Sequence, residues 1–289
     1  KTLSAFASIL NYLINIDEKG EIEEKVYAIY ISPLKALASD VEFNLKGPLA
    51  EMEKIAKRKF NINVAMRTGD TTSSDRQKML KKAPNILVCT PETLAIVLTS
   101  PKFVETLRGV EYVVVDEIHA LTNKRGAYLS LSLERLNDIS LIEPVRIGLS
   151  ATIAPLEEIA RFLVGTDRDC LIGDVKLLKD IEIDLDFPGG DILEAETPES
   201  QKELYKTLDK LIGENRTTLI FTNTRAATER IVHFLDLHFP GKYAGLIGAH
   251  HSSMSKETRF EIEDKLRRGE LKVVVSSTSL ELGIDIGSI

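Results

Sequence analysis

The sequence predicts an α/β protein built as two units, each a mainly parallel sheet flanked by helices. Short β-rich apolar runs alternate with amphipathic stretches along the whole chain, which is the pattern of βα units. The runs are too many for one small sheet, and 289 residues suffice for two domains with separate cores. The expected strands span residues 26–31, 62–68, 86–90, 110–115, 145–149, 181–187, 218–222, 244–247 and 271–275.

Helix punctuation supports the same fold class. Proline near the start and glycine just past the end delimit two expected helices, and a serine caps a third, which ends on two arginines. These helices span residues 156–164, 198–213 and 256–268. The charged, irregular segment 165–187 is the expected passage between the units, with the boundary near Gly173. The predicted domains are therefore residues 1–172 and 173–289.

Composition limits the classes of function. The chain has 37 basic and 44 acidic residues, a net charge of −7, which does not fit a protein that coats nucleic acid through a basic field. Contacts with nucleic acid would have to be local. Cys89 and Cys170 lack CxxC spacing, so neither a disulfide framework nor a thiolate zinc site is supported. No apolar run approaches the roughly 20 residues that cross a bilayer, and we expect a cytoplasmic protein with no membrane partner.

The strongest local signal for chemistry is an apolar run that stops at two consecutive carboxylates, Asp116 and Glu117. In an open α/β sheet, ligands bind beyond the carboxyl ends of the strands. One carboxylate can hold Mg²⁺ through its water shell while its neighbour orients or deprotonates an attacking water, as phosphoryl transfer requires. The alternative is an acidic helix cap after a core strand, and these residues alone do not decide between the two.

Two further segments occupy comparable places. Lys1 and Thr2 precede an apolar helical stretch and look like the end of a GxxxxGK[ST] loop, with Lys1 for phosphates and the Thr2 hydroxyl for Mg²⁺. Ser150 and Thr152 follow another strand end, where two hydroxyls could pass a hydrogen bond between the carboxylates and the other domain. Taken alone, these two residues favour a simple N-cap before Pro155.

Short motifs follow one another along both units. The first unit contains KT at 1–2, SPLKAL at 32–37, RTGD at 67–70, TPET at 90–93, DEIHAL at 116–121 and GLSATI at 148–153. The second contains LIFTNTR at 219–225, HHSS at 250–253 and STSLELGIDIG at 277–287. In this order the motifs resemble those of superfamily 2 helicases, and their wording is most similar to the Lhr, or large helicase-related, group. The resemblance spans the whole chain.

The resemblance implies two RecA-like domains of the P-loop NTPase type, with ATP and Mg²⁺ in the cleft between them. It implies that Glu117 is the catalytic base, that Asp116 and Thr2 hold the metal, and that His119 links ATP to the strand site. The implied catalytic residues are Asp116, Glu117, His119, Ser150 and Thr152. The implied nucleotide contacts are Lys1, Thr2, Gly283 and Asp285.

The resemblance also implies that a single nucleic-acid strand lies across both domains, with DNA favoured over RNA and no stable protein partner. The residues concerned are mostly hydroxyls, amides and loop positions, which suit a grip on phosphate and sugar rather than base reading. They are Pro33, Lys35, Arg67, Thr68, Gly69, Thr90 and Pro91 in the first domain and Thr222, Asn223, Arg225, His250 and Ser277 in the second.

The implied function is ATP-dependent 3′-to-5′ unwinding of DNA, in repair or recombination. A motor directed to RNA or to RNA–DNA hybrids remains open, because 2′-hydroxyl contacts cannot be read from a sequence. A clamp without catalysis has no need of Asp116 and Glu117. A hydrolytic metal centre that includes His250 and His251 is disfavoured, because adjacent side chains of an extended segment point to opposite faces.

Two parts of the family pattern are absent from the sequence. They are the glycine-rich start of the phosphate loop and the later arginine that stabilises the transferred phosphate. Such an arginine contributes on the order of 10³–10⁵ in rate. We therefore expect these 289 residues alone to hydrolyse ATP negligibly, and we assign the activity to a longer parent protein.

Overall fold

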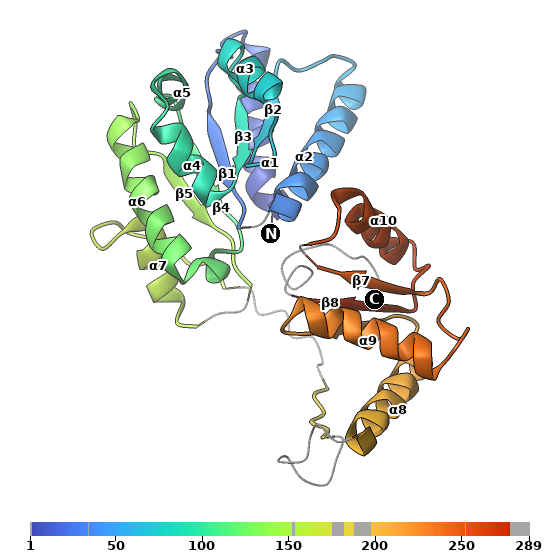
Figure 1. The fold of residues 1–289 in the computed structure, drawn as a ribbon. Coiled ribbons are helices and arrows are strands. Elements are labelled where there is room, and N and C mark those ends of the chain that lie inside the picture. The colour runs from blue at the N-terminus through green and yellow to red at the C-terminus, as the bar shows by residue number, and fades with distance from the viewer. Residues whose placement is uncertain are drawn as a thin grey trace. The chain divides into compact units, whose positions relative to one another are not determined.

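The chain folds into two compact units, residues Lys1–Val175 and Lys176–Ile289. In this computed structural model the described residues are 2–33, 35–151, 154–174, 182–187, 198–251 and 253–277. Figure 1 shows each unit as a sheet with helices packed against it. The predicted boundary near Gly173 lies close to the observed division. Within the described ranges, no helix has the length and apolar character needed to cross a membrane.

The described part of the first unit forms a five-stranded sheet in the order β2-β3-β1-β4-β5. Every neighbouring pair is parallel, which confirms the predicted α/β class. Tyr30 of β1 lies opposite Val114 of β4, and the carboxyl ends of all five strands meet at one edge. The strands are β1 (Ala28–Ile31), β2 (Val64–Arg67), β3 (Ile86–Cys89), β4 (Tyr112–Val115) and β5 (Val145–Gly148).

Helices cover both faces of this sheet, so the central strands are buried on both sides. On one face, Phe6 of α1 and Leu45 of α2 pack with Tyr30 and Val114. On the other, residues of α3 to α7 pack with the alternate strand residues, such as Val113. The helices are α1 (Thr2–Glu18), α2 (Lys35–Ala56), α3 (Ser73–Lys81), α4 (Pro91–Leu98), α5 (Pro101–Leu107), the 3-10 helix η1 (Ile118–Leu121), α6 (Lys124–Ile139) and α7 (Leu156–Val164).

In its described residues, the second unit forms a three-stranded parallel sheet in the order β6-β8-β7. Tyr205, Leu235 and Val273 lie in its main core cluster. The predicted cap is confirmed, because the Ser255 side chain accepts the backbone N–H of Thr258 at the start of α10. The elements are α8 (Pro198–Glu214), β6 (Thr218–Phe221), α9 (Arg225–His238), β7 (Ile247–His250), α10 (Lys256–Arg267) and β8 (Val273–Ser276).

Two predicted strands differ from the structure. The described part of the sixth expected strand, residues 182–187, forms no strand, and its apolar side chains are exposed, Leu185 fully. Alternating polarity mimicked a strand there, but a strand needs a hydrogen-bonded neighbour. The strand expected at 244–247 begins only at Ile247, because Gly245 has a left-handed φ of +73° and belongs to the preceding turn.

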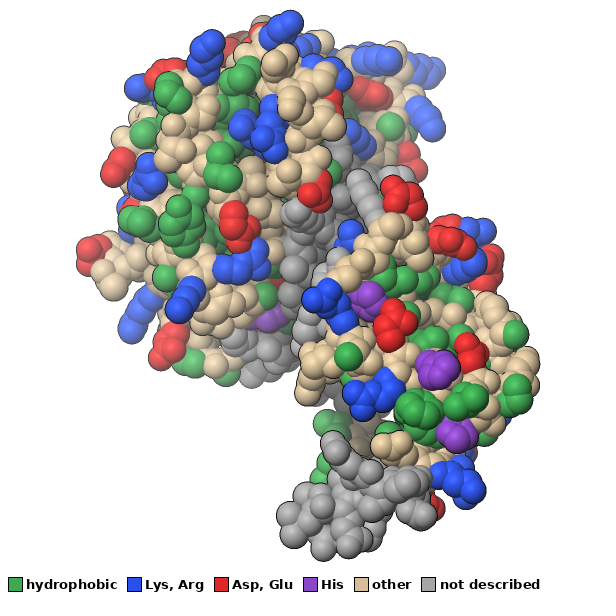
Figure 2. All heavy atoms as spheres, in the orientation of Figure 1, with side chains coloured by type: hydrophobic (Ala, Val, Ile, Leu, Met, Phe, Trp, Pro, Cys, Tyr) green, Lys and Arg blue, Asp and Glu red, His purple; other side chains and the backbone are tan. Residues whose placement is uncertain are grey.

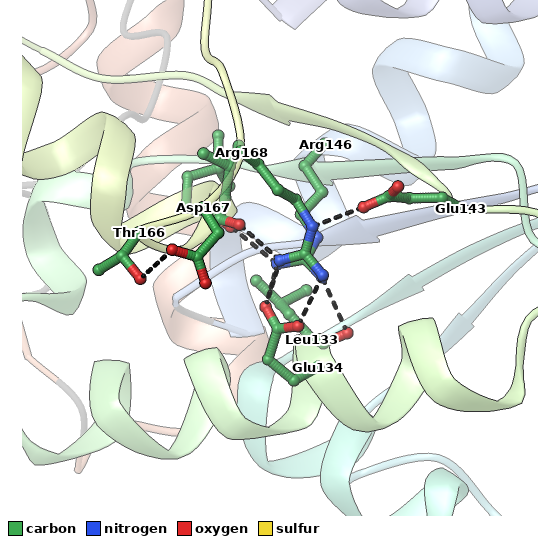
Figure 3. Close-up of polar contacts among 9 residues, drawn as sticks. Leu133, Glu134, Glu143, Arg146, Thr166, Asp167 and Arg168 are labelled. Atoms are coloured by element: carbon green, nitrogen blue, oxygen red, sulfur yellow. Dashed lines mark hydrogen bonds and ion pairs between the residues drawn. The ribbon is translucent and has the colours of Figure 1, made fainter.

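A cluster of ion pairs connects α6, β5 and the chain after α7 in the first unit (Figure 3). Arg146 of β5, whose side chain is 5% exposed, donates to the Glu134 carboxylate of α6 at 2.7 Å. Arg168, which follows α7, donates to the other oxygen of that carboxylate at 2.9 Å and to Glu143 at 2.5 Å. Both guanidinium groups also donate to carbonyls at the end of α7. One carboxylate thus joins α6, β5 and the chain after α7, and its pKa is lowered to about 2.

Candidate functional site

The predicted carboxylate pair lies at the carboxyl end of β4. The backbone N–H of Asp116 donates to the carbonyl of Ile31 at 2.9 Å, so the β1–β4 ladder continues one step beyond the strand. The Asp116 carboxylate accepts hydrogen bonds on both oxygens, from the Tyr30 hydroxyl on Oδ2 and from the backbone N–H of Glu117 on Oδ1. The orientation of the first carboxylate is therefore fixed before any ligand arrives.

Glu117 turns the chain away from the sheet. Its φ of 45° and ψ of 44° place it in the left-handed region, which a residue with a Cβ adopts at a cost of about 1–2 kcal/mol. The turn directs the chain into η1, where the N–H of Ile118 donates to the carbonyl of Leu149 at 3.0 Å. The Glu117 side chain remains 20% exposed. The second carboxylate is thus presented at the sheet edge by a strained backbone.

His119 joins the carboxylates to the chain after β5. Its Nδ1 lies 3.3 Å from Glu117 Oε2, 3.4 Å from Ser150 Oγ and 3.3 Å from the backbone nitrogen of Ala151. The Ala151 N–H needs an acceptor, whereas the carboxylate needs a donor, so Nδ1 can satisfy only one of them at a time. The N-cap alternative for Ser150 is not what is seen, because Pro155 occupies the N-cap position of α7.

Arg67 is a cation without a bonded acceptor in the described structure. Its guanidinium carbon lies 4.6 Å from the centroid of the Phe103 ring, and its buried Nη1 has no hydrogen-bond partner among the described residues. Burial, and then the neighbouring Arg76, lower the pKa of the Arg67 guanidinium below its usual value. An anion placed there would relieve both effects.

The other residues of the first unit that are predicted to contact nucleic acid lie directly after β1, β2 and β3. Thr68 is 4% exposed, and its hydroxyl accepts the N–H of Asp70 at 3.3 Å. Thr90 is 5% exposed and pairs with the Thr93 hydroxyl at 3.1 Å. The two threonine hydroxyls therefore take part in hydrogen bonds within the protein, and their contact with nucleic acid stays a prediction. Pro33 and Gly69 lie in the loops after β1 and β2, and Pro91 is the first residue of α4.

Arg125 is a residue of this region that the sequence analysis missed. From the first turn of α6, its Nε donates to Glu92 Oε1 at 2.6 Å and its Nη2 donates to the Pro33 carbonyl at 2.7 Å. Despite partial burial, which acts the other way, this contact holds the pKa of Glu92 below its usual value. Arg125 thus links the segment after β1 with the start of α4, and both segments contain residues predicted to bind nucleic acid. Its partners lie 92 and 33 positions earlier, so no local signal reveals it.

The start of α6 is packed closely against η1. Gly126 is buried, and a Cβ placed on it would lie 1.5 Å from the carbonyl oxygen of Leu121. The first turn of α6, which carries Arg125, therefore packs directly against η1, which carries His119. This close approach leaves no room for a side chain at residue 126.

In the second unit the predicted residues gather at the carboxyl ends of β6, β7 and β8. Thr222 donates its N–H to the Ser276 carbonyl at 2.8 Å and shares its hydroxyl with Thr228. Asn223 and Arg225 are exposed at the start of α9. Ser277 is 7% exposed and donates its N–H to the carbonyl of His250 at 3.1 Å.

The two adjacent histidines point to different helices, as their extended backbone predicts. His250 is fully buried and its Nε2 lies 3.0 Å from Glu263 on α10, whereas His251 Nε2 lies 2.6 Å from Glu229 on α9. The contact between His250 and nucleic acid that the resemblance implies stays a prediction, and the His250 side chain is buried in this structure. In the described part of the chain, no group of three or more His, Cys, Asp or Glu residues is arranged to hold a metal.

Some predicted residues lie outside the described structure. They are Lys1, Thr152, Gly283 and Asp285, together with the side chain of Lys35. On the face shown in Figure 2, Lys and Arg side chains are interspersed with Asp and Glu over the coloured surface of each unit. On that face the charge pattern agrees with a local grip on nucleic acid rather than a basic field.

Comparison with known proteins identifies family models over both units. A DEAD/DEAH box helicase model matches residues 1–161, which is more than half of the chain. A helicase conserved C-terminal domain model matches residues 202–289. The two matched ranges fall in the two compact units.

Individual relatives agree with these models. The ATP-dependent helicase Lhr-Core of Methanocaldococcus jannaschii is 55% identical over 295 residues, and that of Saccharolobus solfataricus is 50% identical over 294; each match covers 100% of this chain and 34% of the relative. The structure of Mycobacterium smegmatis helicase Lhr bound to ssDNA and AMP-PNP is 37% identical with a TM-score of 0.85, covering 100% of this chain and 37% of that one. The chain spans about a third of the length of these relatives. It belongs to the DEAD/DEAH box helicase family and, within that family, to the Lhr group.

Proposed function

We propose that the protein carrying these residues couples ATP hydrolysis to 3′-to-5′ movement along single-stranded DNA and unwinds duplexes ahead of it. The observation that carries the proposal is the edge of the first sheet, where Asp116 and Glu117 emerge together and His119 Nδ1 lies 3.3 Å from Glu117 and 3.4 Å from Ser150. A passive clamp has no use for two carboxylates at this place. The related Mycobacterium smegmatis structure, bound to ssDNA and AMP-PNP, supports the same pair of ligands.

The proposed roles follow from position and chemistry. Glu117, presented at the sheet edge, is the general base that activates the attacking water. Asp116 and Thr2 are proposed to hold Mg²⁺, and their oxygens suit that hard cation. Both are near the Tyr30 hydroxyl, which donates to the Asp116 carboxylate and whose pKa the Thr2 side chain affects. When bound, the metal would neutralise charge on the phosphates. Lys1, Gly283 and Asp285 are proposed nucleotide contacts.

Strand binding is proposed for the loops at the carboxyl edges of the two sheets. Arg67 offers an unsatisfied cation to a phosphate, and exposed Asn223 and Arg225 offer donors from the second unit. The buried hydroxyls and backbone of the remaining loops would shape the groove for the sugar–phosphate chain. Movement would follow if ATP favours one arrangement of the two grips and hydrolysis releases it, since each ligand shifts the equilibrium by its differential affinity.

The test is steady-state ATP hydrolysis by the complete protein, comparing wild type with Glu117→Gln, with and without single-stranded DNA, single-stranded RNA and duplex. We expect stimulation by one single strand and its loss in Glu117→Gln, with ATP and strand binding retained. The matched control is Glu105→Gln, which removes the charge of an exposed surface pair with Arg108 and should hydrolyse ATP normally. Hydrolysis indifferent to every nucleic acid would overturn the motor, and stimulation by RNA alone would reassign its track.

A further inference from the structure

The Tyr30 hydroxyl lies in a core cluster made mostly of apolar side chains. Its side chain is 1% exposed and its ring stacks on Phe6 of α1, with ring centroids 5.0 Å apart. The side chains of Tyr30 and Val114 lie in the same core cluster, on the face covered by α1 and α2. Because strand residues alternate between faces, Asp116, two positions after Val114, points to this same face. The phenol oxygen therefore reaches the carboxylate from inside the core.

The Tyr30 hydroxyl joins two elements of the proposed nucleotide site. It donates to Asp116 Oδ2, and the Thr2 side chain at the start of α1 lies near enough to affect the pKa of the same hydroxyl. A hydroxyl has one proton and two lone pairs, so donating to Asp116 leaves it free to accept from Thr2. Each Asp116 oxygen, after accepting one bond, still has lone-pair capacity for a further ligand. The arrangement aligns the two side chains without filling their remaining sites.

We propose that Tyr30 is a positioning residue for the Mg²⁺–nucleotide site, holding the Asp116 carboxylate and the Thr2 hydroxyl in one fixed geometry. The inference rests on the proposed ATP hydrolysis, because it names the group that aligns the two oxygens assigned to the metal. Packing against Phe6 accounts for an aromatic ring at position 30 but not for its hydroxyl, because phenylalanine would fill the same space. The hydrogen bond to Asp116 explains its hydroxyl, and that bond leads to this site.

The experiment replaces Tyr30 with phenylalanine in the complete protein and measures two quantities. The first is the affinity for a fluorescent ATP analogue with and without Mg²⁺; the second is kcat for ATP hydrolysis as Mg²⁺ is titrated. We expect metal-free binding within about twofold of wild type. We expect the Mg²⁺-dependent gain in affinity and kcat each to fall about tenfold, the size of one hydrogen bond to a charged group.

Tyr27→Phe is the matched control. Tyr27 is also buried, at 2% exposure, and lies in the same core cluster, but its hydroxyl accepts the backbone N–H of Glu23 at 3.0 Å, away from the carboxylates. It should leave Mg²⁺ dependence unchanged. If Tyr30→Phe lowers thermal stability while its Mg²⁺ dependence stays that of wild type, the hydroxyl is only a core bond and the inference is wrong.

A double substitution keeps the inference testable if the single variant is poorly stable. With Asp116→Asn in place, the charged acceptor is gone, so adding Tyr30→Phe should reduce Mg²⁺-dependent nucleotide binding by less than twofold further. Fully additive losses would overturn the coupling of Tyr30 to Asp116. Failure of the proposed function looks different: wild-type protein would then show no strand-stimulated hydrolysis, while the Mg²⁺-dependent binding comparison would still decide the role of Tyr30.

Discussion

Glu134→Gln tests whether the ion-pair cluster of Figure 3 stabilises the first unit. Hydrogen bonds from Arg168 and then Arg146 lower the pKa of Glu134 from 4.5 to about 2. Such a shift corresponds to about 3 kcal/mol at neutral pH if solvent screened none of it. The Glu134 side chain is 41% exposed, so we discount this to about 1–2 kcal/mol. Glutamine keeps one acceptor oxygen but loses the charge.

The lowered pKa of Glu134 determines how the stability difference between Glu134→Gln and wild type changes with pH. A carboxylate with a lowered folded pKa stabilises the protein fully above its unfolded value of 4.5, and this contribution disappears as pH falls toward 2. Urea denaturation followed by circular dichroism should therefore show Glu134→Gln less stable than wild type at pH 7, with the gap shrinking between pH 5 and pH 3. Hydrogen exchange in β5 and α7 should locate the loss.

Glu105→Gln serves as the comparison for this measurement. Its exposed pair with Arg108 should change stability by less than about 0.5 kcal/mol. Equal urea midpoints for Glu134→Gln and wild type at pH 7 would refute the reasoning. So would a stability gap that stays constant down to pH 3, because it would then not come from the ionised carboxylate.

Three further predictions concern single contacts. Arg125→Lys keeps the charge but cannot bridge Glu92 and the Pro33 carbonyl, so the strand concentration giving half-maximal ATPase stimulation should rise several-fold with little change in kcat. Phe103→Leu removes the ring beneath Arg67 and should weaken strand affinity two- to fivefold in a fluorescence anisotropy titration. Thr224→Ala removes the α9 cap and should lower the unfolding free energy of the second unit by about 1 kcal/mol in urea.

The sequence predicted best where one local rule decides the structure. Alternation of apolar runs and amphipathic stretches was enough for two parallel sheets, and Asp116 and Glu117 emerge from β4 because parallel strands end at one edge. Ser255 caps its helix because the bond spans only three residues. Each of these features depends on neighbours along the chain.

The failures are long-range. The alternation over residues 182–187 predicted a strand, yet pairing requires another segment that no local pattern specifies. Burial of His250 against Glu263 depends on α10 folding back over β7, and the hydrogen bond from Tyr30 to Asp116 joins residues 86 positions apart. Fold class and the carboxylate pair were therefore readable in advance. The groups that orient the pair were not.

We expect Gly126, which has no side chain, to tolerate substitution as poorly as a catalytic residue. The atom in the way of a Cβ is a backbone oxygen, so no change of rotamer in a neighbour can make room for it. Any larger residue would push η1, and His119 with it, away from the start of α6. In a saturation library selected for activity, alanine at this position should be eliminated as completely as lysine. Selection at residue 126 would therefore preserve the absence of a side chain, even though glycine contributes no chemical group to the site.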